Sequence, residues 1–166
     1  MPLPSSRVSV RVPVVADIPA IWALLEDHKA QWIDDFTDFD QQYVFDRFQS
    51  NNLLVLDQYG FCKGVVWVCE RRGNLWAEVK AVVRPESKSA AVRIGKQVVS
   101  AAFHHFNVAR IKVNLWEHSK SRTKVLNRLQ FKQICFFRNE TMRNGKKLDI
   151  YVHELRRNYW EKLNHG

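Results

Sequence analysis

The spacing of apolar residues changes near residue 85, and this change constrains the fold more than any other feature of the sequence. Before it, LLVLDQ, KGVVWVCE and LWAEVKAVV are rich in β-branched and aromatic residues, with turn signals between them at Tyr59-Gly60 and RRGN. After it, apolar residues recur at helical spacing: Val92, Val98, Val99, Ala102, Phe103 and Phe106. We therefore expect a three-stranded meander and then a long amphipathic helix over residues 89–106.

Further strands and helices are predicted on both sides of this unit. RVSVRVPV alternates like a half-buried strand, and ADIPAIWALLEDHKAQW and QQYVFDRFQ read as helices, the first with Asp17 as N-cap. RIKVNLW predicts a strand, SKSRTKVLNRLQF a basic helix, and KQICFFRNETM and LDIYVHEL a hairpin around Asn144-Gly145. The tail RRNYWEKLNHG is either a helical turn or loose.

This order of elements predicts an α/β (α+β) fold. We expect one domain spanning residues 1–166, with a core over about 7–155 and a C-terminal tail over 156–166. Its centre would be a mixed, mostly antiparallel, twisted sheet of about six or seven strands, flanked by about four helices. The hydrophobic content of 46% is sufficient for such a core.

The composition also excludes some classes of protein. The first residues contain no apolar signal region, and no later apolar run approaches the length of a membrane span, so neither secretion nor membrane insertion is expected. The three cysteines, Cys62, Cys69 and Cys135, lack C-x-x-C spacing, which favours reduced thiols without a metal role. We expect a cytoplasmic protein that binds no metal.

Charge is distributed unevenly along the chain. Residues 1–83 carry 8 Lys/Arg against 11 Asp/Glu, whereas residues 84–166 carry 18 against 6. The basic second half suggests a polyanionic partner, from a phosphorylated cofactor to RNA or DNA, although a solvated lysine-rich surface is the simpler alternative. The acidic residues cluster in one short stretch: Asp34, Asp35, Asp38, Asp40 and Asp46.

Three stretches, in this order, resemble the GCN5-related N-acetyltransferase (GNAT) superfamily. AEVKAVVRPESKSAAVRIGKQVVSAAF resembles its acetyl-CoA segment, and VNLWEHSKSRTKVLNRLQF resembles the strand and helix that follow. FFRNETMRNGKKLDIYVHEL resembles the closing hairpin of the ribosomal-protein N-terminal acetyltransferase branch. The resemblance extends from about Val8 to Leu155. It implies a GNAT-like fold and acyl-CoA-dependent N-acyl transfer, with acetyl-CoA as cosubstrate, directly to an amine of a protein or small cationic acceptor.

The acetyl-CoA loop departs from the superfamily pattern Q/R-x-x-G-x-G/A. When the pattern is set on residues 86–91, Glu86 replaces the basic or amide residue and Ser89 replaces the glycine that lets a pyrophosphate approach backbone N–H groups. Small side chains and the helix N-terminus would supply part of that function. The cofactor contacts that the resemblance implies are Val82, Val83, Arg84, Ser87, Lys88, Ser89, Ala90, Ala91, Arg93, Ser119 and Arg122.

Two residues are candidates for the acid–base chemistry. Glu78 matches the glutamate that some GNAT members use as a base, and its apolar neighbours would raise its pKa, although it could also be a polar residue on a solvent-facing strand. The tyrosine that many members carry in the last helix falls on Leu126, so Tyr151 is the substitute acid. The resemblance also implies a bulge in LWAEVKAVV that separates this strand from the next and admits pantetheine. Direct transfer with proton loss through water would need neither side chain.

Other functions remain open from the sequence. The acidic stretch 34–46 would border the acceptor cleft and attract a cation, or be only a solvated connector. The degraded loop also resembles that of small tailed-phage proteins, which would make the chain a catalytically inactive GNAT-fold binding or assembly protein. The basic half could instead form a nucleic-acid-binding module for RNA, DNA or a ribosomal surface. A monomer and a homodimer are equally compatible with the sequence.

Overall fold

Seven strands form one sheet in the computed structural model, which describes residues 8–84, 88–116 and 120–165, with the backbone alone at 88, 89 and 165. The strand order is β1-β2-β3-β4-β5-β7-β6, and every neighbouring pair is antiparallel except β4–β5, which is parallel. The strands are β1 (Ser9–Arg11), β2 (Leu53–Gln58), β3 (Phe61–Arg72), β4 (Trp76–Val83), β5 (Arg110–Trp116), β6 (Lys132–Arg143) and β7 (Lys146–Arg156). The predicted mixed, mostly antiparallel sheet is confirmed.

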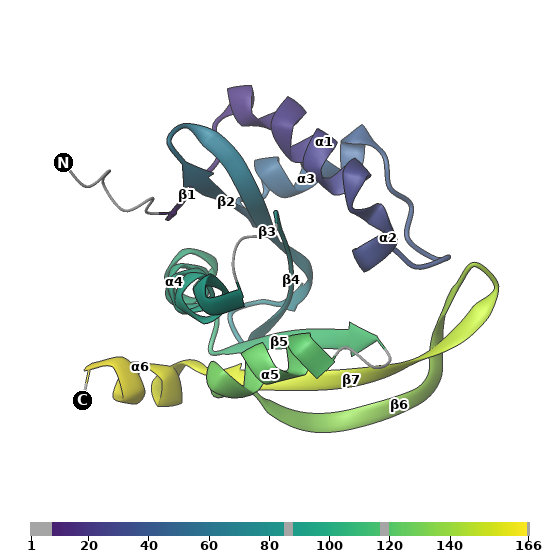
Figure 1. The fold of residues 1–166 in the computed structure, drawn as a ribbon, viewed down its shortest axis with the longest axis vertical. Helices are drawn as coiled ribbons and strands as arrows, with labels where there is room; N and C mark the ends of the chain where they lie inside the picture. The colour runs from purple at the N-terminus through teal and green to yellow at the C-terminus, as the bar shows by residue number, and fades with distance from the viewer. Residues whose placement is uncertain (1–7, 85–87, 117–119, 166) are drawn as a thin grey trace.

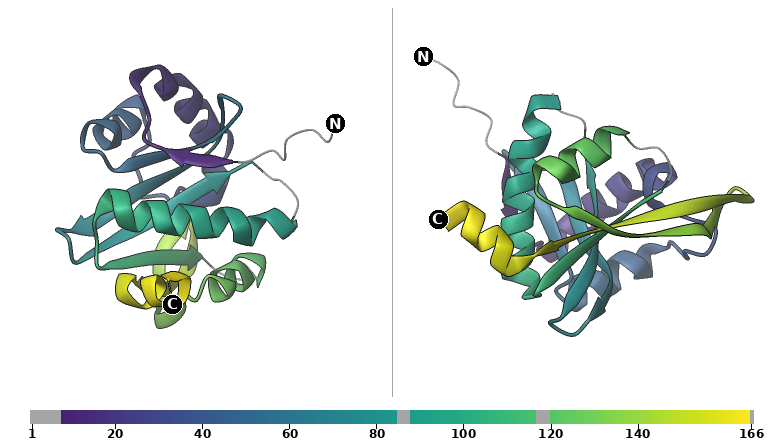
Figure 2. Two further views of the ribbon diagram at one scale, coloured as in Figure 1. Left: turned by 90° about the vertical axis from the view of Figure 1, so that its left-hand side faces the viewer. Right: turned by 90° about the horizontal axis from the view of Figure 1, so that it is seen from below.

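Helices cover both faces of the sheet (Figure 1, Figure 2). They are the 3-10 helix η1 (Val15–Asp17) and helices α1 (Ile18–Asp27), α2 (Lys29–Trp32), α3 (Gln41–Gln49), α4 (Lys88–Phe106), α5 (Lys120–Arg128) and α6 (Arg157–His165). The described residues thus contain more helices than the four expected. One reason is that the first predicted helix divides at His28, whose φ of −109° and ψ of 10° are not helical. The other is that the tail forms α6.

Each face of the sheet has its own hydrophobic core. On one face α4, α5 and α6 pack over the sheet through Phe103, Phe106, Leu129 and other apolar side chains. On the other face α1, α2 and α3 surround the buried rings of Trp32 and Trp67. We call these the α4 face and the α1–α3 face.

The tail contributes to the α4-face core, although the core was expected to end near residue 155. Trp160 of α6 is only 5% exposed, and its indole Nε1 donates to Ser100 Oγ of α4 at 3.1 Å. Burying an indole while satisfying its N–H is a stabilising arrangement, so α6 is held firmly against the domain.

Two hairpin turns follow the sequence signals. Asn144 and Gly145 both adopt positive φ, 51° and 74°, as do Tyr59 and Gly60, 54° and 80°. Two successive residues with positive φ match the twist of the flanking antiparallel strands, which explains why glycine occupies the second position of each turn. No helix within the described ranges is long and apolar enough to cross a membrane.

Candidate active site at the split between β4 and β5

The sheet opens between its two parallel strands. β4 and β5 pair at Trp76–Arg110, Ala77–Ile111 and Glu78–Lys112, and the described residues pair no further although both strands continue. Figure 1 shows β5, β6 and β7 running in a different direction from β1–β4. Backbone groups at the facing edges of this split therefore lack strand partners, and an extended molecule with amide groups could pair with them.

A bulge lies beside the split, but in β3 rather than in β4, where it was expected. Val68 pairs with Val79 and Glu70 pairs with Glu78, so Cys69 of β3 is the extra residue. A bulge increases local twist and bends the strand that carries it. The distortion thus reaches β4 at Glu78, the position where pairing with β5 ends.

The backbone of β4 alternates between facing β3 and facing the split. The N–H of Arg84 donates to the carbonyl of Lys63 in β3 at 2.8 Å, and residues two apart on an antiparallel strand face the same way. Val82 therefore faces β3; a Cβ added to Gly64 would lie 2.8 Å from its carbonyl oxygen. Ala81 and Val83 direct their backbone groups toward the split.

The two valines for which the sequence predicted cofactor contacts differ in this respect. Val82 places its side chain in the α1–α3-face core and its backbone against β3, whereas the backbone of Val83 faces the split. Sequence reasoning missed Ala81. Counting alternate residues back from Val83 would have found it.

Glu78 is placed at the closed end of the split and faces the α1–α3 side. Ala77 and Val79 belong to the α4-face core, whereas Lys80, on the same side as Glu78, donates from Nζ to the carbonyl of Trp32 at 3.1 Å. Burial raises the pKa of Glu78, and Lys80 and Lys112 offset this only in part. The Glu78 side chain is half-buried rather than exposed.

Uncharged neighbours surround Glu78 as well as charged ones. Burial raises the pKa of Tyr43 to about 12 and the pKa of Cys69 to about 12, and the charge of Glu78 adds to both shifts. Both groups stay protonated at neutral pH. Cys69 is therefore a poor nucleophile, and Glu78 is the group in this neighbourhood suited to take up a proton.

Tyr151 lies on the opposite face of the sheet from Glu78. It pairs with Leu115, three residues beyond Lys112, and its ring packs in the α4-face core and against Phe136, with ring centroids 4.9 Å apart. The structure therefore does not bring the two predicted catalytic side chains together on one face. They could act on one molecule only from opposite sides of the split.

The predicted phosphate-binding residues lie where α4 and α5 begin. Because β4 and β5 are parallel, the helices that follow them start at the same edge of the sheet. Ser87 and Ser119 lie outside the described residues, as do the side chains of Lys88 and Ser89, whose backbone opens α4.

The described members of this set differ in exposure. Arg84, Arg93 and Arg122 are exposed, Ala91 is half-buried, and Ala90 is buried in the α4-face core, so Ala90 could offer a ligand only its backbone. The guanidinium of Arg122 makes one long contact, 3.5 Å, with Gln31 Oε1 of α2. Three exposed guanidinium groups near two helix N-termini form a suitable environment for phosphate groups.

Solved structures with a similar fold include acetyltransferases. A spermidine N-acetyltransferase from Vibrio cholerae, in complex with CoA and spermine, matches at a TM-score of 0.77 and 16% identity over 94% of this chain and 99% of that chain. A GNAT-family acetyltransferase from Bacillus anthracis matches at 0.68 and 14%, over 93% and 97%. A ribosomal-protein-alanine N-acetyltransferase from Brucella melitensis matches at 0.73 and 15%, over 89% and 98%.

This chain has the GNAT fold. The comparisons favour no branch of it, since the spermidine and ribosomal-protein enzymes match to a similar extent. No family model and no curated protein matches the sequence.

The acidic stretch is largely structural rather than open to a ligand. Asp34 accepts hydrogen bonds from Thr141 Oγ1 at 2.6 Å, from Thr37 Oγ1 at 2.7 Å and from the N–H of Phe36. Burial raises its pKa, but these hydrogen bonds outweigh burial and leave the pKa below its usual value. Asp34 therefore ties the connector between α2 and α3 to β6.

Two more of the clustered carboxylates are also occupied. Asp35 accepts from the N–H groups of Asn144 and Gly145 at 2.8 and 2.9 Å, which secures the β6–β7 turn. Asp40 is the N-cap of α3 and accepts from the N–H of Tyr43 at 3.0 Å. Attraction of a cation by this stretch as a whole is thus not supported by its hydrogen bonding.

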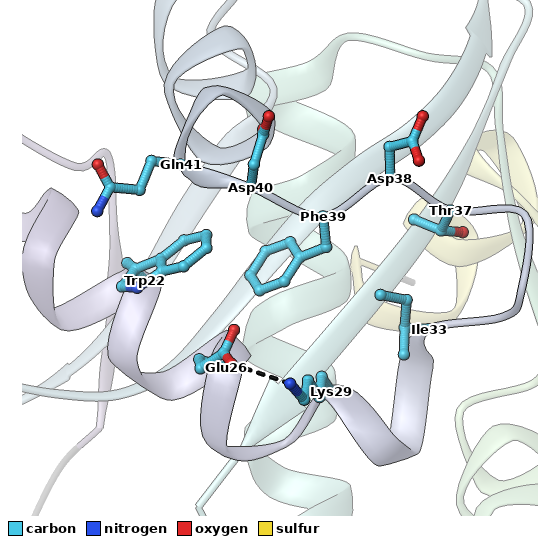
Figure 3. A pocket seen from close by; sticks show the side chains of 9 residues that line it. All are labelled: Trp22, Glu26, Lys29, Ile33, Thr37, Asp38, Phe39, Asp40 and Gln41. Carbon is cyan, nitrogen blue, oxygen red and sulfur yellow. Dashed lines mark hydrogen bonds and ion pairs between the residues drawn. The ribbon is translucent and has the colours of Figure 1, made fainter.

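A surface pocket of about 560 Å³ lies between α1, α2 and the segment before α3 (Figure 3). It is lined by Trp22, Glu26, Lys29, Ile33, Thr37, Asp38, Phe39, Asp40 and Gln41, and the rings of Trp22 and Phe39 stack at 4.6 Å. Asp38 and Asp40 of the acidic stretch line it, but none of the predicted catalytic or cofactor-binding residues does. The candidate base and the unpaired strand edges lie together at the split instead. Among the described residues, no cluster of three His, Cys, Asp or Glu side chains could hold a metal ion.

Proposed function

We propose that this protein is an acyl-CoA-dependent N-acyltransferase that transfers an acetyl group directly to an amine. The observation that carries the proposal is the position of Glu78, half-buried at the closed end of a split whose strand edges lack partners. Acetyl-CoA would supply the acyl group activated as a thioester. The residues present suit such a molecule, because unpaired strand edges bind amides and helix N-termini with exposed arginines bind phosphates.

Each part of the site has a defined task in this proposal. The backbone groups of Ala81 and Val83 hold an extended amide chain and orient the carbonyl to be attacked. The helix starts of α4 and α5, with Arg84, Arg93 and Arg122, hold phosphate oxygens. Glu78 removes a proton from the amine, directly or through water, because a protonated amine has no electron pair for attack.

The acceptor is proposed to be a cationic amine. The charges of Glu70 and Asp34 act on Glu78 in the direction that favours a bound proton or cation, whereas those of Lys80 and Lys112 act against it. A neighbouring GNAT structure was solved with the polyamine spermine, which has this chemistry. A lysine side chain or a protein N-terminus has it too.

Titration calorimetry with acetyl-CoA, desulfo-CoA and ADP tests the donor half of the proposal. Ser89→Glu places a negative charge in the first turn of α4, so we expect it to abolish micromolar binding. Gln97→Glu adds the same charge on an exposed position later in α4, and we expect it to bind as the wild type does.

Acetylation of spermidine, a lysine peptide and a free N-terminal peptide tests the acceptor half. Turnover of any of them, lost together with donor binding in Ser89→Glu, supports the enzyme. Absence of binding heat at millimolar acetyl-CoA would overturn the proposal and leave a non-catalytic binding protein with the GNAT fold.

A further inference from the structure

Asn114 carries a buried polar atom that the fold does not use. Its Oδ1 has no hydrogen-bond partner within the described part of the chain, although solvent cannot reach it. Asn114 lies on β5 two residues beyond Lys112, the last residue that pairs with β4. Residues two apart on a strand share a face, so Asn114 projects on the same side as Glu78 and beside the split.

The neighbouring donors are directed to other partners. If β4 and β5 kept their register, Lys80 would lie beside Asn114, but its Nζ donates to the carbonyl of Trp32 at 3.1 Å. The ammonium of Lys112 lies 4.3 Å from the ring centroid of Trp76. A buried carbonyl oxygen without a donor is unfavourable, and in a natural protein it calls for a partner that the fold does not supply, such as a water molecule, an ion or a ligand.

We propose that Asn114 Oδ1 accepts a hydrogen bond from the N–H of the acceptor amine and holds it beside Glu78. This inference rests on the proposed function. Glu78 and Asn114 are offset by one strand and two residues, which in a regular sheet separates two Cα atoms by about 8 Å, and the opening of the sheet beyond Lys112 adds to this. Two side chains projecting from one face over that distance can direct their oxygens at one nitrogen. Because solvent does not reach Asn114 Oδ1, the amine contacts it only when the side chains that cover it move aside.

The direction of the side chain favours the amine over the amides of the donor. An extended amide chain that pairs with strand edges lies in the plane of the sheet, as a strand does. Asn114 projects out of that plane, toward the α1–α3 face and Glu78. Its oxygen therefore meets a group that lies on the face of the sheet that carries Glu78.

The uncharged carbonyl oxygen of Asn114, which accepts a hydrogen bond, also determines which amines suit the site. A primary amine that has lost one proton to Glu78 keeps two N–H groups. One bonds Asn114, and the other proton passes to the CoA thiolate, directly or through water, after the new C–N bond forms and the C–S bond breaks. A secondary amine keeps one N–H, whose loss leaves Asn114 unsatisfied. The site should therefore prefer primary amines to their N-methyl counterparts.

Steady-state kinetics of Asn114→Leu test this preference for primary amines. Asn114→Asp keeps an oxygen that can accept a hydrogen bond. Gln133→Leu, at an exposed position on β6, is the matched control. We expect Asn114→Leu to lower kcat/KM for a primary amine roughly tenfold or more. In Asn114→Leu the preference for the primary amine over its N-methyl counterpart should disappear. The affinity for acetyl-CoA and the melting temperature should not fall. Asn114→Asp should keep the preference. If Asn114→Leu does not fold, Asn114→Ala is measured in its place.

Two results would overturn the inference while leaving the proposed function intact. One is that Asn114→Leu changes neither amine kinetics nor acetyl-CoA binding. The other is that it weakens acetyl-CoA binding but leaves amine kinetics unchanged, which would assign the Asn114 oxygen to acetyl-CoA. A wild-type protein that neither binds acetyl-CoA nor acetylates any amine would overturn the proposed function, and the inference with it.

Discussion

Glu78 and Lys112 are the last residues at which β4 and β5 pair, yet the Lys112 ammonium lies over the ring of Trp76. The ammonium of the residue that pairs with Glu78 is therefore directed toward the Trp76 ring. Burial prevails, and the pKa of Glu78 is raised. The same geometry places a proton acceptor at the point where the sheet opens.

Replacing Glu78 with glutamine should lower kcat/KM for the amine by about 10²–10⁴, the usual contribution of a general base. In the wild type, kcat/KM should rise with pH as Glu78 loses its proton, and this limb should be absent in Glu78→Gln. Glu70→Gln should shift the limb to lower pH without removing it, because the charge of Glu70 helps to raise the pKa of Glu78. Unchanged activity in Glu78→Gln would exclude it as the base.

The raised pKa of Glu78 also predicts a pH-dependent effect on stability. The folded state holds the proton more tightly than the unfolded state, so the contribution of Glu78 to stability is fully present below its unfolded pKa and is lost as pH rises through its folded pKa. Glu78→Gln should therefore gain stability relative to the wild type between acidic and neutral pH. Urea denaturation at several pH values measures this, and a difference that does not change with pH would contradict it.

Gly64 and Gly95 test how closely the elements around the site are packed. A Cβ on Gly64 would lie 2.8 Å from the carbonyl oxygen of Val82 and 3.2 Å from the Cα of Val83, both backbone atoms of β4. A Cβ on Gly95 would meet the end of the Leu129 side chain at 2.7 Å. Because a side chain moves more readily than a strand, Gly64→Ala should lower the free energy of unfolding by about 1–3 kcal/mol and Gly95→Ala by less. Binding of acetyl-CoA should be weakened only in Gly64→Ala. Equal losses in the two variants would refute this ranking.

Thr141→Val should lower the free energy of unfolding by about 1–2 kcal/mol at neutral pH, because Asp34 loses its shortest hydrogen bond. The lowered pKa of Asp34 means that its stabilising contribution is present above its unfolded pKa and is lost as pH falls through its folded pKa. The difference between wild type and Thr141→Val should therefore shrink in acid. Denaturation curves at neutral and acidic pH measure it, and an effect of constant size would assign it to packing instead.

Trp160→Ala should lower the free energy of unfolding by about 3–5 kcal/mol, since the indole is buried in the α4-face core. Trp160→Phe keeps most of the apolar contact and loses only the bond to Ser100, so it should cost much less. Tyr159→Ala, at a residue 39% exposed, is the matched control. Thermal unfolding distinguishes them, and a wild-type-like Trp160→Ala would show that α6 is dispensable.

Elements with a strong local pattern were predicted closely. RIKVNLW is β5 and QQYVFDRFQ is α3, residue for residue, because apolar periodicity and caps act over a few residues. The break at His28 and the docking of α6 through Trp160 were not predicted, since each depends on contacts with residues far away in the sequence. Arg84 and Glu78 could be named from the resemblance, but Ala81 and Asn114 could not, because their significance follows from strand register.

The sequence by itself determined the order of strands and helices, the two glycine turns and the basic edge where α4 and α5 begin. These follow from side-chain spacing and composition along a short stretch of chain. Only the tertiary structure decided that Glu78 faces the α1–α3 side, that Tyr151 lies on the opposite face, and that Asp34 is held by Thr141, 107 residues away. Strand register decides such relations, because a shift of one residue turns a side chain to the other face and exchanges its partners.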